Sequence, residues 1–582
     1  MTTPPTSRSA AITDEIIRGS LVAITDEMKT NLMRTAYNPI IYEALDYTVG
    51  LFDENGDTVS IGLGLPMFIK GLSETVKAKI AHWGLDGIRP GDVLLTNDAY
   101  VTGSHLNHIV LTVPVFHGGR VVAFASSMAH WIDIGGVLGG RTTDIYSEGL
   151  QIPFCKVVKD GVEDQEILGF IEMNVRRPEL AFGDYRAQIA AIRTGQRRLS
   201  ALLGRYGLNT VGSSIERMYA HSEALARAAV AQVPDGTYSA ETLMDDDGIT
   251  KAPIPIKVTV TVHGDRMIVD LTEISPQVAG YFNSGAAAGR SASQVAFKCL
   301  TTPLQMPINE GAFRPLEVVL PPGRVVSAER PAAMQWWMTI PITVVDTIFK
   351  ALATAMPEQV HAAHHADLNI AHLSGIDEQG RFFQDLVNIP GGGWGAGRHA
   401  DGMASTVCIN DGDTHNTPVE ANEARLPILV ETYRLRPDSG GPGRHRGGLG
   451  VEMTTRVLCT SRFSAGIERT RSAPWGLDGG RAALPNQVRY SVEGQDVVPP
   501  TGKIDATILA PDDYISIRSG GGGGYGHPHD RPAEDVARDV VEGYVSAEVA
   551  HDVYGVAVDE TGNVDHEHTR RLRAQNREVT TP

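Results

Sequence analysis

The sequence predicts a multi-domain α+β protein, with mixed and antiparallel β-hairpins and sheets flanked by helices and a helical segment at the C-terminal end. Three observations lead to this prediction. Several long segments repeat apolar residues every three to four positions, as amphipathic helices do. Short apolar runs elsewhere face each other across tight turns, as hairpin strands do. The chain has 582 residues, whereas one domain usually takes roughly 100–200.

The first expected domain covers residues 1–235 and carries the candidate site. It begins with an amphipathic helix over 17–32, followed by a hairpin whose turn is Asp53-Glu54-Asn55-Gly56. The further apolar patterns predict strands at 92–95, 109–116 and 121–128 and helices at 73–82, 183–206 and 215–233. A helix-rich first domain around several hairpins therefore follows from local patterns alone.

The second expected domain, 236–515, begins after the turn Pro234-Asp235-Gly236. Its first hairpin pairs 256–262 with 267–271, and short strands then alternate with loops rich in glycine and proline. After the glycine run 520–524 the sequence becomes charged and helical, so 516–582 is expected to be a glycine-rich loop followed by a helical C-terminal segment.

The composition excludes several classes of function. The chain has 51 Lys and Arg against 69 Asp and Glu, a formal charge of −18, which would repel nucleic acid and anionic membranes. We see no apolar run of membrane-spanning length and no signal peptide at the N-terminus, so we expect a cytoplasmic protein without a membrane partner. Its four cysteines are far apart and form no CxxC, and we expect them to be reduced.

Two pairs of polar residues stand out in the segment 96–136. The first is His105-x-x-His108 and the second is His130-x-x-Asp133. One expected strand follows the first pair, and another precedes the second. Three imidazoles and a carboxylate suit a divalent metal, with zinc as the first choice and iron(II) or manganese as alternatives. The other interpretation is a set of polar residues that cap a hairpin or form a surface cluster.

The turn between these strands predicts that the two pairs meet. If Gly118-Gly119 forms a two-residue hairpin loop, His108 lies opposite Ala129 and His130 lies opposite Asn107. Both pairs then share the open end of one hairpin. Asp46, which precedes the first strand, is a fourth ligand candidate, although an acid at this position is more often a solvated strand start.

Two other histidine clusters are weaker candidates. His361 and His365 have the i, i+4 spacing of one helix face, with His364 between them, but no HExxH motif is present. A packed or exposed helix end explains them better. His527 and His529 lie beside the glycine run 520–524 and suit hydrogen bonds to a partner chain better than a metal.

The sequence lacks the motifs of several other chemistries. No GxxxxGK[ST] phosphate loop occurs, the glycine runs lack the strand–GxGxxG–helix context of dinucleotide binding, and GxSxG is absent. Metal-activated water or a metal-polarised carbonyl is therefore the chemistry that the candidate residues favour.

A series of ordered motifs resembles the hydantoinase B/oxoprolinase family, which includes N-methylhydantoinase B subunits and the large subunits of acetone and acetophenone carboxylases. The resemblance extends over nearly the whole chain. The motifs that carry it are LMRTAYNP, LFDENGD, GDVLLTNDAY, TGSHLNH, AHWIDIGG, YSEGLQIP, NVRRPE, GDYRAQIAA, GGGWGAG, NTPVEANE, YRLRPDSGGPGRHRGGLG and GGGGGYGHP.

The resemblance implies a hetero-oligomer with a hydantoinase A-type subunit, a sugar-kinase/actin-like ATPase that uses ATP to phosphorylate a lactam or enol oxygen. The B-type subunit then supplies the metal centre, whose ligands fall on Asp46, His105 and His130. Many relatives have HxxD where this chain has His105-x-x-His108, so His108 is either a substitute ligand or a group behind the ligands. The resemblance alone places Glu148 in the same cavity.

We therefore expect the metal-bearing subunit of an ATP-dependent hydrolase that opens a hydantoin, lactam or oxoproline-like ring. The alternative is a subunit of an ATP-dependent ketone carboxylase. A third hypothesis, a scaffold subunit without a centre, is disfavoured by the intact histidine set. For Asp133 two interpretations remain open. In the first it is a catalytic residue, which either orients a ligand histidine or accepts the proton of the water. In the second it caps the Asp-Ile-Gly-Gly turn.

Overall fold

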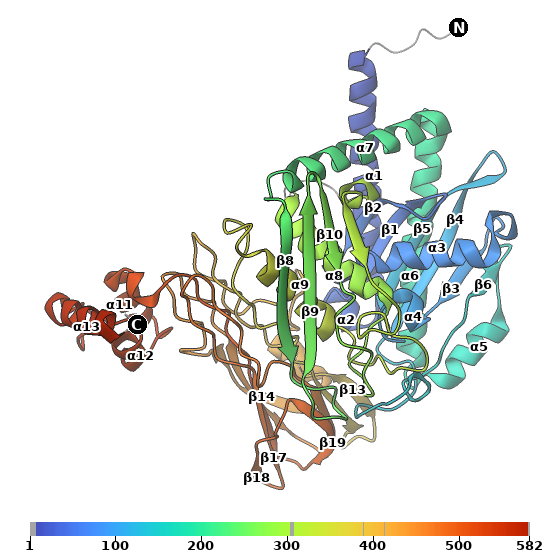
Figure 1. The fold of residues 1–582 in the computed structure, drawn as a ribbon. Helices are drawn as coiled ribbons and strands as arrows, with labels where there is room; N and C mark the ends of the chain where they lie inside the picture. The colour runs from blue at the N-terminus through green and yellow to red at the C-terminus, as the bar shows by residue number, and fades with distance from the viewer. Residues whose placement is uncertain (1–6, 303–307, 388, 413, 580–582) are drawn as a thin grey trace.

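The computed structural model describes residues 7–302, 308–387, 389–412 and 414–579. Its described strands form four sheets, most of them antiparallel, with helices packed on them (Figure 1). The one parallel pair among these strands joins β10 (Arg266–Asp270) and β11 (Leu316–Val319). The expected α+β class, with mixed and antiparallel sheets flanked by helices, is confirmed.

The N-terminal part is built on a seven-stranded antiparallel sheet in the order β2-β1-β5-β4-β3-β6-β7. Its strands are β1 (Tyr47–Asp53), β2 (Thr58–Leu63), β3 (Val93–Thr96), β4 (His108–His117), β5 (Arg120–His130), β6 (Cys155–Lys159) and β7 (Val162–Glu163). Its helices are α1 (Ser7–Thr35), α2 (Pro39–Tyr42), α3 (Gly71–Trp83), α4 (Ala99–Thr102), α5 (Gln165–Asn174), α6 (Pro178–Tyr206) and α7 (Leu208–Val230). Every element predicted here from sequence periodicity is present.

Helices cover both faces of this sheet. Ala125 of β5 lies beneath Gly195 of α6, whereas Met128, three residues further and on the opposite face, lies beside the start of α3. Lys79 of α3 is buried and donates three hydrogen bonds, to Leu94 O, Val110 O and Thr112 Oγ1, each 3.0 Å long. Burial lowers the pKa of Lys79 well below its ordinary value, because it penalises the charged amine.

The described residues of the central part form two large cores and a smaller buried cluster that includes Ile342, Leu368 and Cys408. The first surrounds the sheet β11-β10-β9-β8 and the helices α8 (Ala286–Thr301) and α9 (Thr339–Leu352), with β8 at Gly236–Met244 and β9 at Ile254–His263. The second lies between the sheets β13-β12-β16-β19 and β14-β15-β20-β17-β18. The strands of these two sheets are β12 (Ala371–Ile376), β13 (Phe382–Leu386), β14 (Ile428–Leu435), β15 (Val451–Val457), β16 (Ser461–Gly466), β17 (Gln487–Val492), β18 (Gln495–Val497), β19 (Lys503–Leu509) and β20 (Tyr514–Arg518). The helix α10 (Val419–Arg425) precedes β14.

The C-terminal helices α11 (Ala533–Val541), α12 (Ala547–Asp552) and α13 (His566–Val579) form a small core of their own and stand apart from the N-terminal sheet (Figure 1). Arg531 joins them to the central part, since it pairs with Asp401 at 2.8 Å and Asp539 at 2.9 Å. The expected boundary at 235 falls between α7 and β8, but the one at 515 cuts β20.

Two further expectations concern the whole chain. Among the helices that the structure describes, none is long and apolar enough to cross a membrane. The four cysteines are unpaired thiols; Cys408 and Cys459 are buried, Cys155 is half-buried and Cys299 is exposed.

Candidate metal centre

The hairpin β4–β5 brings the predicted histidines together. Gly118-Gly119 forms its loop with φ values of +59° and +83°, which a two-residue turn of this kind requires. A bulge at Val122 then shifts the pairing by one residue, so His108 lies opposite His130 instead of Ala129. The predicted convergence is confirmed, whereas the predicted register is wrong by one residue because nothing in the local pattern marks the bulge.

The three imidazole rings form one compact cluster. Ring centroids are 4.6 Å apart for His105 and His108, 4.8 Å for His105 and His130, and 5.2 Å for His108 and His130. Pairing of β1 with β5 adds Asp46, whose carbonyl accepts the His130 backbone N–H at 3.1 Å. His108 Nε2 donates to Asp46 Oδ1 at 3.0 Å. All four residues expected to bind metal therefore lie together.

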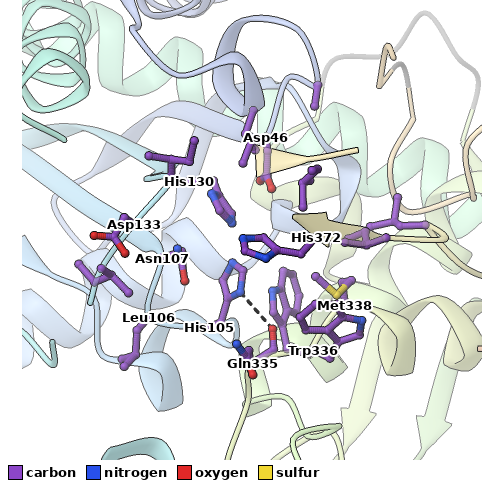
Figure 2. A pocket seen from close by; sticks show the side chains of 18 of the residues that line it. Asp46, His105, Leu106, Asn107, His130, Asp133, Gln335, Trp336, Met338 and His372 are labelled. Atoms are coloured by element: carbon purple, nitrogen blue, oxygen red, sulfur yellow. Dashed lines mark hydrogen bonds between the residues drawn. The ribbon is translucent and has the colours of Figure 1, made fainter. Parts of the chain in front are cut away.

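A cavity of about 140 Å³ opens beside this cluster. Asp46, His105 and His130 line it (Figure 2). His108 does not line it; the ring is buried behind the other two and packs edge-on against Phe68 at a centroid distance of 4.8 Å. Of the two roles left open for His108, a position behind the ligands matches its hydrogen bond to Asp46.

Each imidazole keeps one ring nitrogen without a partner. His105 Nδ1 donates to the backbone carbonyl of Gln335 at 3.2 Å (Figure 2), whereas His105 Nε2, His108 Nδ1 and His130 Nδ1 are buried and have no hydrogen-bond partner among the described residues. Buried polar atoms of this kind are unusual and indicate a missing ligand or water.

The electrostatics keep the lining imidazoles neutral. Burial lowers the pKa of His105 well below its ordinary value and that of His130 to about 4, and the neighbouring His108 adds to both shifts. Burial alone would raise the pKa of Asp46, but the His108 and His130 rings beside it hold that pKa below its ordinary value. The cluster thus presents neutral nitrogens and a carboxylate, the forms in which these groups bind metals.

Among the described residues, no group of three or more His, Cys, Asp or Glu side chains is arranged so that it could hold a metal ion. The cavity therefore holds a set of potential ligand groups. These groups contact one another, and some of their ring nitrogens have no hydrogen-bond partner among the described residues.

Glu148 supports this cluster from behind. Its carboxylate accepts hydrogen bonds from Thr142 Oγ1 at 2.7 Å, Met334 N at 2.9 Å and Gln335 N at 2.8 Å. The Gln335 residue whose carbonyl orients His105 is thus held in place by Glu148. Burial raises the pKa of Glu148 to about 7 despite these hydrogen bonds. Glu148 lines the cavity, as the family resemblance implied.

Asp133 is engaged by the protein itself. Its Oδ1 pairs with Arg176 Nη1 at 2.7 Å, its Oδ2 accepts the Arg176 backbone N–H, and the Gly135 N–H donates to Oδ1 at 3.4 Å. Asp133 lies in the cavity wall. Its contacts correspond to the turn-capping alternative and give no support to the catalytic one.

Three cavity residues lie outside the motifs that pointed to the site. Gln335 precedes α9, His372 lies at the start of β12, and Asp411 lies in a loop more than 300 residues beyond His105. Burial and the neighbouring Arg462 lower the pKa of His372 to about 4, and burial raises that of Asp411 to about 7. No local pattern marks these residues, because they reach the cavity only through the packing of the central sheets on the hairpin.

The rival clusters have other environments. The helix expected around His361, His364 and His365 is absent: α9 ends at Leu352 and this described stretch forms neither helix nor strand, so the predicted shared helix face is wrong. His365 Nδ1 donates to Gly393 O at 3.4 Å, and His364 accepts the Ala366 N–H at 2.8 Å. His527 precedes the short 3-10 helix Pro528–Asp530, which contains His529, and the His527 ring accepts the His529 N–H.

Comparison with known proteins identifies relatives along the whole chain. Residues 10–528 match the family model described as Hydantoinase B/oxoprolinase. A Pseudomonas sp. protein, named as the B component of a "Putative D-/L-hydantoinase", is 31% identical over 97% of this chain and 98% of its own. The beta component of the Pseudomonas jessenii caprolactamase is also 31% identical, over 97% and 99%.

Solved structures share the fold. The crystal structure of the ATP-dependent caprolactamase from Pseudomonas jessenii has a TM-score of 0.89 and 29% identity over 97% of this chain and 99% of that one. A nucleotide-free acetone carboxylase has a TM-score of 0.90 over 98% of this chain and 84% of its own. At 20% identity the latter likeness concerns the fold alone.

Proposed function

Because the chain belongs to the hydantoinase B/oxoprolinase family, whose relatives are named as enzymes of cyclic amides, we propose that it is the metal-bearing subunit of an ATP-dependent cyclic amide hydrolase. The substrate class is a hydantoin, lactam or related ring. The observation that carries this proposal is the buried cluster of three imidazoles and one carboxylate beside a cavity.

In this proposal His105, His130 and Asp46 hold a divalent metal, zinc first and iron or manganese as alternatives. The fit rests on their unpartnered, neutral ring nitrogens and on the Gln335 carbonyl, which takes the Nδ1 proton of His105 and leaves Nε2 available. Histidine ligands commonly donate their second nitrogen to a carbonyl in this way. His108 orients the Asp46 carboxylate through its Nε2–H.

A divalent metal in such a site acts as a Lewis acid, polarising a carbonyl or phosphoryl oxygen and making water a better nucleophile. The chain's own residues prepare the site for this chemistry. The apolar wall excludes bulk water, Glu148 and Gln335 fix the tautomer of His105, and the Arg176–Asp133 pair holds the adjoining turn. An unstrained amide resists water, so activation by phosphorylation of its oxygen would precede hydrolysis.

ATP is used, in this proposal, by a partner subunit of the hydantoinase A type. Two relatives that align almost end to end are named as subunits, and the related crystal structure is of an ATP-dependent enzyme. The present sequence contains no GxxxxGK[ST] motif. We therefore expect a hetero-oligomer in which the partner phosphorylates the ring oxygen and this chain hydrolyses the activated intermediate.

The alternative is an ATP-dependent ketone carboxylase, because the family resemblance also includes the large subunits of acetone and acetophenone carboxylases. One assay separates the two. The chain purified with its partner is supplied with ATP and with hydantoins, lactams or ketones, the ketones with and without bicarbonate. ATP consumption with ring opening supports the hydrolase. Turnover of ketones alone, and only with bicarbonate, would refute it.

The metal is tested separately. We expect metal analysis to find close to one divalent ion per chain in the wild type and little in the His105→Ala/His130→Ala variant. His263→Ala is the matched control, because this histidine is 90% exposed and does not line the cavity. Undiminished metal in the double variant would contradict the assignment, whereas loss in the control as well would point to unspecific binding.

A further inference from the structure

The walls of the cavity combine apolar side chains with carboxylates. Much of the described lining is hydrocarbon, including Leu138, Trp336, Met338, Ile370 and Leu386. Acidic residues line it as well: Asp46, Asp133, Glu148, Asp385 and Asp411. Among the described residues that line the cavity, none is a lysine or an arginine.

Three arginines that contact the wall from outside are already engaged. Arg425 forms an ion pair with Asp385 at 3.5 Å. Arg176 pairs with Asp133 at 2.7 Å and also donates to the Gly136 carbonyl. Arg462 donates to the Leu138 carbonyl at 3.0 Å. None of these three arginines lines the cavity, so none is presented to a molecule inside it.

We propose that this cavity selects rings whose body and substituents are uncharged and apolar, and rejects ring substrates that carry a free carboxylate. This inference rests on the proposed function, because it narrows the substrate class of that site. The specificity determinant is the apolar wall formed by Leu138, Trp336, Met338, Ile370 and Leu386, together with the lack of a lysine or arginine side chain among the described lining residues.

The physical reason is the environment that a substrate carboxylate would enter. It would lose its water, find no cationic side chain among the described lining residues to pair with, and lie among groups that include ionised carboxylates. An apolar ring or alkyl substituent would instead replace water along a hydrocarbon wall, which is favourable. Substrate sites that bind carboxylates characteristically supply arginine for the purpose.

Matched substrate pairs test the inference with the complete enzyme, the chain with its partner. Pyrrolidinone is compared with oxoproline, the same ring bearing a carboxylate, and isobutylhydantoin with carboxymethylhydantoin. We expect kcat/KM for ATP-dependent ring opening to be at least about 100-fold higher for the neutral member of each pair. Equal turnover, or preference for the carboxylated member, would overturn the inference and leave the proposed function intact.

Binding to this chain supplies a readout that does not depend on turnover. Trp336 and Trp337 line the cavity, so their fluorescence is titrated with the same four compounds. A response to the neutral members alone supports the inference even if no ring is opened, in which case the proposed hydrolase function fails by itself. A response to neither member, or to the carboxylated members, would overturn the inference.

A cationic substitution in the wall should weaken the discrimination. Leu138→Lys places an amine at the half-buried edge of the cavity, and Leu138→Gln is the uncharged control. We expect the lysine variant to lower the neutral-to-carboxylated kcat/KM ratio at least about 10-fold below that of the glutamine variant. The same ratio in both variants would contradict the role of the missing cation.

Discussion

Replacement of Glu148 by glutamine is expected to change how the stability of the first domain depends on pH. In the folded protein burial raises the pKa of Glu148 to about 7, from an ordinary value of 4.5. Below pH 4.5 the side chain is protonated in both states. Between these two values the unfolded chain releases its proton and the folded chain retains it, so stability falls as pH rises. Above pH 7 the loss is complete.

The difference between the two pKa values corresponds to a loss of about 3 kcal/mol in the free energy of unfolding. About 2 kcal/mol or slightly more of this loss occurs between pH 5 and 8. Glutamine cannot ionise, yet its oxygen can keep the hydrogen bonds from Thr142 and Gln335. As the pH rises from 5 to 8, the stability of the Glu148→Gln variant should therefore increase by about 2 kcal/mol relative to that of the wild type. Glu148→Ala, by contrast, leaves three buried hydrogen-bond donors without an acceptor. Each loss costs roughly 1–3 kcal/mol of stability, so this variant should be strongly destabilised at every pH.

The assay is urea unfolding followed by tryptophan fluorescence at several pH values, with the wild type and variant compared at each. Trp131 and Trp337 belong to the core of the N-terminal part and report its unfolding. Glu54→Gln, at an exposed hairpin turn, is the matched control. A constant difference between wild type and Glu148→Gln from pH 5 to 8 would refute the reasoning, as would a difference that favours the wild type at high pH.

Two further predictions concern the hairpin loop beside the site and a buried ion pair in the central part. Gly118→Val should destabilise the protein by about 1–2 kcal/mol, because a β-branched residue is strained at φ +59°, whereas Gly118→Asn should cost much less. Arg469→Met should cost about 3–5 kcal/mol by leaving Asp346 buried without its cation, and Arg469→Met/Asp346→Leu should recover part of that loss. Denaturant unfolding measures each change.

Each of these two predictions, for the Gly118 variants and for the Arg469 variants, can be contradicted by one result. Equal stability of the valine and asparagine variants would show that backbone strain at the loop does not matter, since no atom within 4 Å would contact an added Cβ there. If the double variant at the buried ion pair were less stable than the single Arg469→Met variant, the unpaired charge would not be the source of the loss.

Local patterns were sufficient for the elements of the N-terminal part. Five residues that repeat along α1 are buried, as their spacing predicts: Ile17, Leu21, Ile24, Met28 and Leu32. The strands of the β4–β5 hairpin and its two-glycine loop were predictable for the same reason, because side-chain periodicity and turn chemistry depend on neighbours in the chain. Proximity of His105, His108 and His130 followed from that loop.

Contacts between distant segments were beyond such patterns. The bulge at Val122 shifted the hairpin by one residue. The stretch around His361 forms no helix, and its backbone donates instead to the carbonyls of Gly393, Ala396 and Trp475. Asp133 forms an ion pair with Arg176. From its neighbours in the chain alone, Asp133 could have been either a catalytic residue or a turn cap. For the stretch around His361 and for Asp133, the partners lie far along the chain, where no local pattern points to them.

The amino-acid order thus specified the fold class, the histidine-bearing hairpin and the family, because each depends on short-range spacing or on motifs within one segment. Packing of the central sheets against that hairpin added Gln335, His372 and Asp411 and enclosed an apolar, acidic cavity whose described lining holds no lysine or arginine. Those residues meet because buried surfaces hundreds of residues apart fit together, and no periodicity along the chain encodes which distant surfaces do so.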